Sequence, residues 1–253
     1  MNAYVLKLIA LVTMLIDHIG YVFMNDNFYM RIIGRIAFPL YALMVVDGCL
    51  HLAESKFGLK KYFGFLTTLA IICEPLYDYA FFGKWTLWSE SNQILQFLTF
   101  VIAFAMCKKL SNNYAKAVAW LGTVAFNEYF HMGYGGAGIL LKLFFMWYLQ
   151  NYKNKSMQWR VVVVTGAMLF YIIYYTGQSI MPMAKLQYFF RNLQYCLFVK
   201  PWWVVIMTVL AIPFLVCYNG SYGSCSARFK NFYKWFYPAH LAIICMVRIV
   251  MEM

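Results

Sequence analysis

Charged side chains are scarce in this sequence, and acidic ones are the scarcest. Only 12% of the 253 residues are charged, with nine Asp and Glu against 21 Lys and Arg. A soluble domain carries about 25% charged and about 45–50% apolar residues, whereas 64% of this chain is hydrophobic. One soluble core cannot bury that much apolar surface. We therefore expect an all-α, polytopic transmembrane helix bundle, with residues 1–253 forming a single integral membrane domain.

Several functional patterns are also missing. The seven cysteines form no C-x-x-C pair and lie mostly in apolar runs, so they are expected to be free thiols. The four histidines are scattered over different apolar segments, so no metal site is predicted. The net charge of +12 comes from short loops, which is typical of membrane topology and not of a nucleic-acid surface. No small-x-small cleavage site follows the first apolar run, so no cleaved signal is expected. No internal repeat is present.

Apolar segments of near 20 residues, the length that crosses a bilayer, recur along the chain. Lys and Arg follow each even-numbered segment, which predicts that these loops and the N-terminus are cytoplasmic. The basic and aromatic stretch 184–200 is predicted to be an amphipathic or re-entrant helix on the outer side, and a ten-span arrangement remains the alternative. The nine predicted spans are residues 5–24, 33–53, 61–82, 93–110, 114–130, 135–151, 159–176, 202–218 and 233–251.

The first predicted span carries an acid and a histidine well inside it, Asp17 and His18. An Asp at mid-helix costs roughly 2.5–3.5 kcal/mol on insertion scales, so we expect this pair to be buried against protein and to be functional. Lys7 lies eleven residues before His18. Eleven residues are about three helical turns, so the two side chains share nearly one face, about 16 Å apart along the axis.

Other polar residues are predicted in the outer half of the membrane, where they could converge with His18 on one cavity. Arg31 and Arg35 begin the second span, and Pro39 is expected to kink that helix and free a backbone carbonyl. For Arg31 the alternative is a guanidinium that reaches the lipid headgroups. The remaining members are Glu74 and Asp78 on the third span and Asn92, Gln93 and Gln96 at the start of the fourth.

Three polar residues are predicted on the inner side. Asp47 and His51 lie one turn apart in the inner half of the second span, and His240 lies early in the last span. A lone histidine in a membrane is often only a hydrogen-bonding residue between helices, and this is the alternative for His51 and His240.

Several motifs together resemble the TraX family. They cover almost the whole chain: Lys7-Leu8-Ile9-Ala10, Asp17-His18-Ile19-Gly20, Arg31-Ile32-Ile33-Gly34-Arg35, Asp47-Gly48, Glu74-Pro75, Tyr134-Gly135-Gly136-Ala137-Gly138 and Tyr237-Pro238-Ala239-His240. The family's namesake is the membrane acetylase of conjugative pilin, and the family is similar to multi-span acyltransferases that use cytosolic acyl-CoA. Many of those carry a basic residue and a His eleven positions apart, as Lys7 and His18 are, although commonly with Arg first. Asp47 stands where Glu is expected.

The resemblance implies an acetyl-CoA-dependent N- or O-acetyltransferase of the bacterial cytoplasmic membrane. Its acceptor would be a peptide, a pilin or another envelope-associated substrate, in contact with membrane lipids and without nucleic acid. A neutral His18 would be the base, beside Asp17, which points about 100° away on the helix. Glu74 would orient the imidazole, and Arg31 or Arg35 would stabilise the oxyanion or an anionic acceptor. An acetyl-histidine intermediate remains open.

The remaining site predictions concern binding. The anionic donor is expected at the basic cytoplasmic loops, with Asp47 and His51 lining its path. The predicted donor-binding residues are Lys56, Lys60, Lys61, Arg228 and Lys230, and the predicted substrate-binding residues are Arg31, Asp78, Gln93, Lys7, Asp47, His51 and His240.

Two rival functions are weaker. A proton-coupled transporter or exporter of a small or lipid-linked metabolite would also use buried acids, histidine and arginines, but no repeated half is visible. A scaffold protein would gain little from such costly charges.

Overall fold

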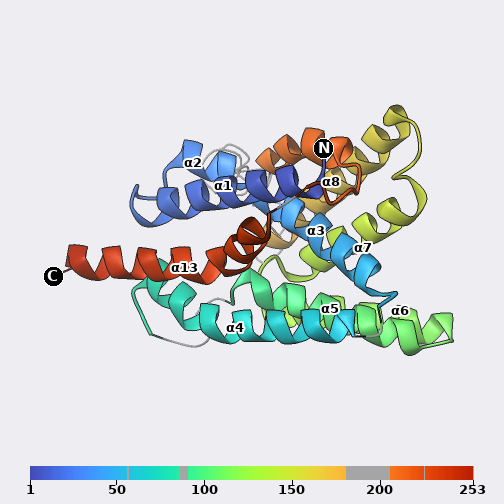
Figure 1. Ribbon diagram of the computed structural model, residues 1–253, viewed down its shortest axis with the longest axis horizontal. Coiled ribbons are helices and arrows are strands. Elements are labelled where there is room, and N and C mark those ends of the chain that lie inside the picture. Colours follow the sequence, from blue (N-terminus) through green and yellow to red (C-terminus); the bar gives the residue numbers. More distant parts are fainter. Residues whose placement is uncertain (56, 86–90, 181–205, 225, 253) are drawn as a thin grey trace. The chain divides into compact units, whose positions relative to one another are not determined.

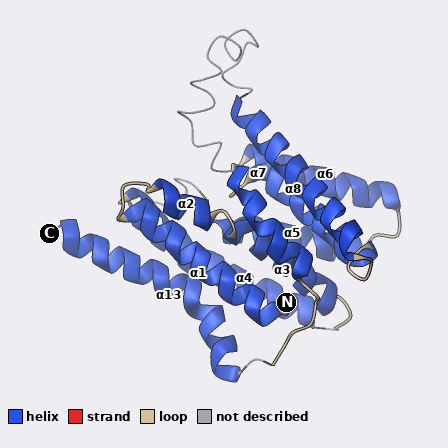
Figure 2. Cartoon of the chain, turned by 90° about the horizontal axis from the view of Figure 1, so that it is seen from above, coloured by secondary structure: helices blue, strands red, loops and turns tan. Residues whose placement is uncertain are grey.

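The structure is a computed structural model that describes residues 1–55, 57–85, 91–180, 206–224 and 226–252. Over these residues it contains helices and loops only, so the all-α prediction is confirmed (Figure 2). The predicted segment 184–200 lies outside the described residues. The helices are α1 (Ala3–Val22), α2 (Phe28–Gly34), α3 (Ala37–Leu52), α4 (Gly58–Phe82), α5 (Gln93–Lys109), α6 (Asn113–Tyr129), α7 (Gly135–Asn151), α8 (Met157–Ile180), η2 (Met207–Ala211), α12 (Ile212–Cys217) and α13 (Ala227–Glu252).

Five of these segments are long and apolar enough to cross a membrane, by length and composition: Ala3–Val22, Phe28–Leu52, Gly58–Phe82, Met157–Tyr175 and Ala227–Met251. The predicted spans around α5, α6 and α7 are helices of 17 residues each. Such a helix is about 25 Å long, at the lower end of what crosses a bilayer. The described part of the eighth predicted span is shorter still, Met207–Cys217. For these four helices, crossing the membrane stays a prediction.

The second predicted span is interrupted between α2 and α3, at Arg35 and Ile36. Arg35 lies four residues before Pro39, and a proline has no N–H to bond the carbonyl four residues earlier. The amide of Arg35 bonds the carbonyls of both Arg31 and Ile32, at 3.1 and 3.2 Å, which tightens the last turn of α2. The helix is thus interrupted four residues before Pro39, where the sequence predicts a kink.

Contacts between residues group the chain into two compact units. Unit 1 comprises residues 1–43 and 147–221, and unit 2 comprises residues 44–146 and 222–253. Each unit is built from two separate segments, and each is described here by itself. The predicted single membrane domain stays a prediction.

In unit 1, α1 packs along α2 (Figure 1), and α12 packs on α8. The start of α1 is tied to the segment that follows α12: the amide of Ala3 donates to the carbonyl of Ser221 at 2.8 Å, and that of Asn219 to the carbonyl of Met1 at 2.9 Å. The guanidinium of Arg160, at the start of α8, donates to the carbonyl of Tyr218. The starts of α1 and α8 and the end of α12 thus lie at one end of unit 1.

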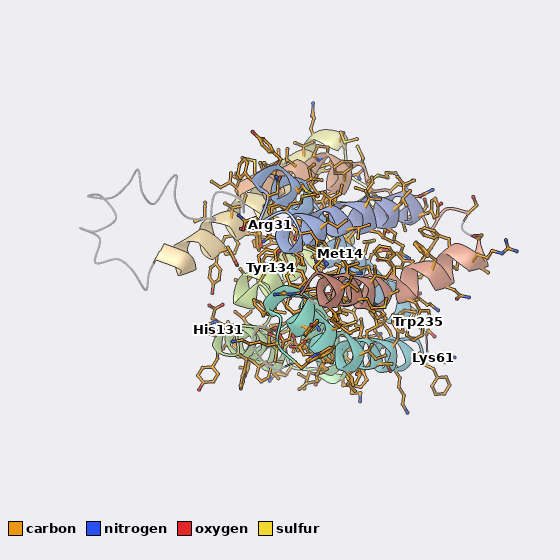
Figure 3. The ribbon with its side chains drawn as sticks, turned by 90° about the vertical axis from the view of Figure 1, so that its left-hand side faces the viewer. Met14, Arg31, Lys61, His131, Tyr134 and Trp235 are labelled. Carbon is orange, nitrogen blue, oxygen red and sulfur yellow. The ribbon has the colours of Figure 1, made fainter. Side chains whose placement is uncertain are left out.

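In unit 2, α4 packs against both α5 and α13. Helices α4 and α13 run parallel, because Phe65 meets Trp235 at 6.4 Å between ring centroids and the thiol of Cys245 donates to the carbonyl of Leu76 at 3.2 Å. Figure 3 shows Lys61 and Trp235 at one end of this unit and His131 and Tyr134 at the other. A shared direction for α4 and α13 is what the charge-based topology requires of two odd-numbered spans.

Candidate functional site

A carboxylate on α1 pairs with two arginines of the following segment in unit 1. Asp17 on α1 accepts from Nη1 of Arg31 at 2.7 Å and lies 3.4 Å from Nη2 of Arg35. Nε of Arg31 also pairs with Asp26 in the preceding loop, at 2.9 Å. We call these four residues the ion cluster. The side chains of Asp17, Arg31 and Arg35 are 15%, 20% and 11% exposed, so most of each charge is removed from solvent.

Local geometry explains how α2 comes so close to α1. The connecting loop reverses through Asn25 and Asp26, which adopt left-handed backbone conformations with φ of 51° and 57°. Asn27 caps α2 by accepting from the amide of Met30 at 3.2 Å. A Cβ added to Gly34 would lie only 2.1 Å from Oδ1 of Asp17, so glycine is required where α2 meets the carboxylate.

His18 follows Asp17 on α1 and is 8% exposed. Successive residues on a helix point about 100° apart, so the Asp17 carboxylate is turned to the arginines and away from its neighbour's ring. Lys7 is half-buried nearer the start of the same helix. The catalytic role of His18 and the binding role of Lys7 stay predictions.

A second buried polar site lies in unit 2, where α4 meets the start of α5. Glu74 is 5% exposed, and its Oε2 accepts from the side-chain amide of Asn92 at 2.6 Å and from the Asn92 backbone amide at 3.2 Å. Asp78, one turn further along α4, is completely buried. Pro75 lies within α4, which continues unbroken from Gly58 to Phe82. The acid beside the proline is thus buried within protein.

Lys142 is a residue that the sequence interpretation missed. This lysine on α7 is completely buried, and its Nζ donates to Oε1 of Gln96 at 2.8 Å and to the carbonyl of Gly138 at 3.2 Å. Nζ also lies 5.0 Å from the ring centroid of Phe97. A lone lysine within the predicted span 135–151 is the same kind of signal as an intramembrane acid, and it could have been found on that ground.

Gln96 connects this lysine to the turn before α7. Its side-chain amide donates to the carbonyls of Met132 at 2.9 Å and Gly135 at 2.7 Å. Gln93 donates its own amide to Oε1 of Gln96. The contacts of Gln96 fix the turn before α7, and the substrate-binding role of Gln93 stays a prediction.

His240 and Arg248 on α13 both make contacts within unit 2. His240 is 4% exposed, its Nδ1 lies 3.0 Å from the carbonyl of Phe236, and its ring stacks on that of Phe236 at 5.1 Å. Both contacts lie within α13, so the substrate-binding role of His240 and its helix-packing alternative stay predictions. Arg248, not predicted as a site residue, donates to the carbonyl of Ala80 at 3.0 Å and so caps the end of α4, a favourable place for a cation.

The predicted donor-binding residues of unit 2 gather at one end. Lys60 and Lys61 are exposed in the first turn of α4, and Arg228 and Lys230 are exposed in the first turn of the parallel helix α13. We call these four residues the basic end (Figure 3 labels Lys61). Lys56, also predicted here, lies outside the described residues.

Asp47 and His51 lie on the part of α3 that belongs to unit 2. The exposed ring of His51 packs against that of Tyr222 at 5.0 Å. Partial burial raises the pKa of the Tyr222 phenol, and the negative charge of Asp47 raises it further. Asp47, His51 and Tyr222 therefore form one group. That they line the donor's path stays a prediction.

The predicted site residues thus fall into two sets. Asp17, His18, Arg31 and Arg35 lie together in unit 1, whereas Glu74 lies in unit 2. The predicted convergence on one cavity, with Glu74 orienting the His18 ring, stays a prediction.

Comparison with known proteins gives one family and one curated relative. The sequence model described as TraX protein matches residues 2–248 of this chain. A relative from Dichelobacter nodosus, named "Probable fimbrial assembly protein FimC, serogroup H1", is 24% identical over 259 residues, covering 99% of this chain and 97% of the relative. No solved structure matches.

Proposed function

Because this chain belongs to the TraX family, we propose that it is an integral membrane acetyltransferase. It moves an acetyl group from cytosolic acetyl-CoA to an amine or hydroxyl group of an envelope-associated peptide or protein. The namesake of the family acetylates pilin, and the Dichelobacter nodosus relative is named for fimbrial assembly, so a pilus or fimbrial subunit is a natural acceptor. The observation that carries the proposal is a buried histidine beside the ion cluster, in a helix apolar enough to cross a membrane.

The basic end is the proposed site for the nucleotide of the donor. Coenzyme A carries several negative charges on phosphates, and four exposed cations from α4 and α13 lie together there. A cluster of one sign attracts a ligand of the opposite sign from solution and raises its local concentration. Loops at this end are also those that the charge rule assigns to the cytoplasm.

His18 is the proposed base. A neutral imidazole suits proton transfer near pH 7. As the acceptor's nitrogen or oxygen bonds to the acetyl carbon, His18 takes its proton and delivers it to the sulfur, which leaves as the free thiol of coenzyme A when the C–S bond breaks. Arg35, which is 11% exposed and pairs with Asp17 at 3.4 Å, is the proposed cation that stabilises the oxyanion.

The test is thioester cleavage by the purified full chain in lipid nanodiscs, followed as release of free thiol from acetyl-CoA with and without added peptide acceptors. His18→Asn keeps a polar side chain but removes the base, and it should lower the rate about 10²–10⁴-fold. His131→Asn is the matched control, because His131 is exposed and its left-handed backbone tolerates asparagine. Binding of acetyl-CoA without thioester cleavage under any acceptor would overturn the proposal and favour a transporter.

A further inference from the structure

Helices α4 and α13 lie side by side at the basic end, with their cations at one level. The ring of Phe65 meets that of Trp235 at 6.4 Å. Five residues earlier on each helix stand Lys60 and Lys230. Further along, the thiol of Cys245 bonds a carbonyl of α4, so the two helices stay together. The first turns of two parallel helices therefore form one group of positive charges.

Exposed aromatic side chains follow these cations on both helices. Phe63 on α4 is 40% exposed, and Phe232 and Trp235 on α13 are 52% and 50% exposed. They come two to five residues after the cations, which is about 3–8 Å further along the helix axes. Lys234, also exposed here, can reach the level of the other cations through its four-carbon stem. This end of unit 2 thus has an outer layer of cations and an inner layer of exposed rings.

The lengths of α4 and α13 indicate where these layers lie in a membrane. The helices have 25 and 26 residues, which makes them about 37–39 Å long, whereas the hydrocarbon core of a bilayer is about 30 Å thick. About five residues of each helix therefore project into the headgroup layer, and the first turns carry the charges that belong there. The exposed rings then lie at the boundary between headgroups and hydrocarbon, where aromatic residues are enriched.

We propose that the basic end binds the phosphate of an anionic phospholipid in the cytoplasmic leaflet, with the aromatic layer against the glycerol and upper acyl chains. Anionic headgroups attract basic residues beside membrane-spanning helices, and four exposed cations supply the complementary charge. A soluble phosphate needs only the cations, whereas half-exposed rings directly beneath them are matched by an apolar neighbour. The occupant is therefore a lipid.

This inference goes beyond the proposed function and gives the donor a competitor. Acetyl-CoA and the lipid both present phosphate to the same cations, so anionic lipid should weaken the binding of acetyl-CoA. Only this consequence rests on the proposed donor site. Lipid binding itself can be measured without any donor.

The first arm compares the lipids that the full chain retains, by native mass spectrometry from micelles holding equal amounts of phosphatidylglycerol and phosphatidylcholine with the same acyl chains. The wild type should prefer phosphatidylglycerol about tenfold or more, and Lys61→Gln with Lys230→Gln should lower this preference about fivefold or more. Lys109→Gln with Lys116→Gln removes the same charge from the end of α5 and the start of α6, and it should leave the preference intact. Equal retention of both lipids by the wild type, or an equal loss in both double variants, would overturn the inference.

A second arm separates the lipid from a soluble phosphate. Glycerophosphoglycerol, the headgroup without acyl chains, should not displace the bound lipid at equal concentration, because it offers the rings no apolar partner. Phe63→Ala with Phe232→Ala should lower the retention of both lipids and preserve the preference for phosphatidylglycerol. Displacement by the headgroup alone, or an aromatic variant that retains lipid like the wild type or loses the preference, would contradict the proposal.

The third arm measures the binding of acetyl-CoA by equilibrium dialysis against the full chain in nanodiscs. In the wild type, replacing about a tenth of the phosphatidylcholine by phosphatidylglycerol should weaken binding several-fold, and a larger share should add little, because a site saturates. A loss that grows steadily with phosphatidylglycerol, and equally in Lys61→Gln with Lys230→Gln, would reflect repulsion by the bilayer surface and contradict competition. If acetyl-CoA binds in no bilayer, the proposed function fails, and the first arm still decides the inference.

Discussion

Gly34→Ala tests the close packing of α1 and α2 on which the ion cluster depends. The new Cβ would lie 2.1 Å from Oδ1 and 2.2 Å from Cβ of Asp17, where ordinary contact begins at 3.4 Å. Because the Cβ of Asp17 is fixed to the α1 backbone, side-chain rotation cannot relieve this clash, and α2 must move away. Overpacking costs about 1–3 kcal/mol, and separating a buried ion pair costs about 3–5 kcal/mol.

These two costs set the expected magnitude. The side chains of Asp17 and Arg31 keep 15% and 20% exposure, so solvent offsets part of the ion-pair loss, and we expect the lower end of the summed range, about 4 kcal/mol. At about 2–4 °C per kcal/mol for a chain of this size, the apparent melting temperature should fall by about 8–16 °C. Thermal unfolding in detergent, read as loss of the monodisperse peak in size-exclusion chromatography, measures it.

Gly166→Ala is the matched control for this experiment. Gly166 lies on α8 in the same unit, and a Cβ there meets no atom within 4 Å. Alanine favours a helix over glycine by about 1 kcal/mol, so the control should melt at the wild-type temperature or slightly above it. Equal melting of the two variants would refute the tight approach of Gly34 to Asp17.

Three further changes test the other groups. Lys142→Met should leave the melting temperature unchanged or raise it, because replacing a buried ion by an apolar residue of similar volume is often neutral or stabilising, whereas Lys142→Ala should lower it by leaving a cavity; an equal fall in both would contradict this. Lys61→Glu with Arg228→Glu should raise the KM for acetyl-CoA about tenfold in low salt, with kcat unchanged, and the difference should shrink as salt is added; a salt-independent KM would argue against an electrostatic donor site. Arg35→Lys keeps the charge but loses the planar fork, so kcat for acetyl transfer should fall about tenfold or more at constant KM, and an unchanged kcat would remove Arg35 from oxyanion stabilisation.

The helices follow from the sequence because the bilayer constrains both length and composition. A spanning segment needs about 20 apolar residues and must satisfy its own backbone, which leaves helix as the outcome. The predicted spans 5–24 and 61–82 accordingly correspond to Ala3–Val22 and Gly58–Phe82. The sequence also predicted a kink from Pro39, and the structure interrupts the helix at Arg35, the residue whose carbonyl Pro39 cannot bond.

The partners of the buried polar residues were less predictable than the helices, because these partners depend on how the helices pack. Sequence spacing alone showed that Asp17 points away from His18, yet its pairing with Arg31 depends on the left-handed loop residues and on the absence of a side chain at Gly34. Lys142 carried a visible signal, as a charge inside an apolar run, but its partner Gln96 comes from another helix. The free-energy cost of placing a charged side chain in the membrane can be predicted from sequence. Which residue pairs with that side chain and offsets the cost depends on how the helices pack.

Helix direction provides a check on topology that is independent of loop charges. In unit 1 the start of α1 is hydrogen-bonded to Asn219 and Ser221, so both lie on one side of the membrane. An even number of crossings must therefore separate them, which the eight predicted spans between these points supply. In unit 2 the parallel packing of α4 and α13 requires an odd number of crossings between those helices, and five predicted spans fit. The nine predicted spans satisfy both relations.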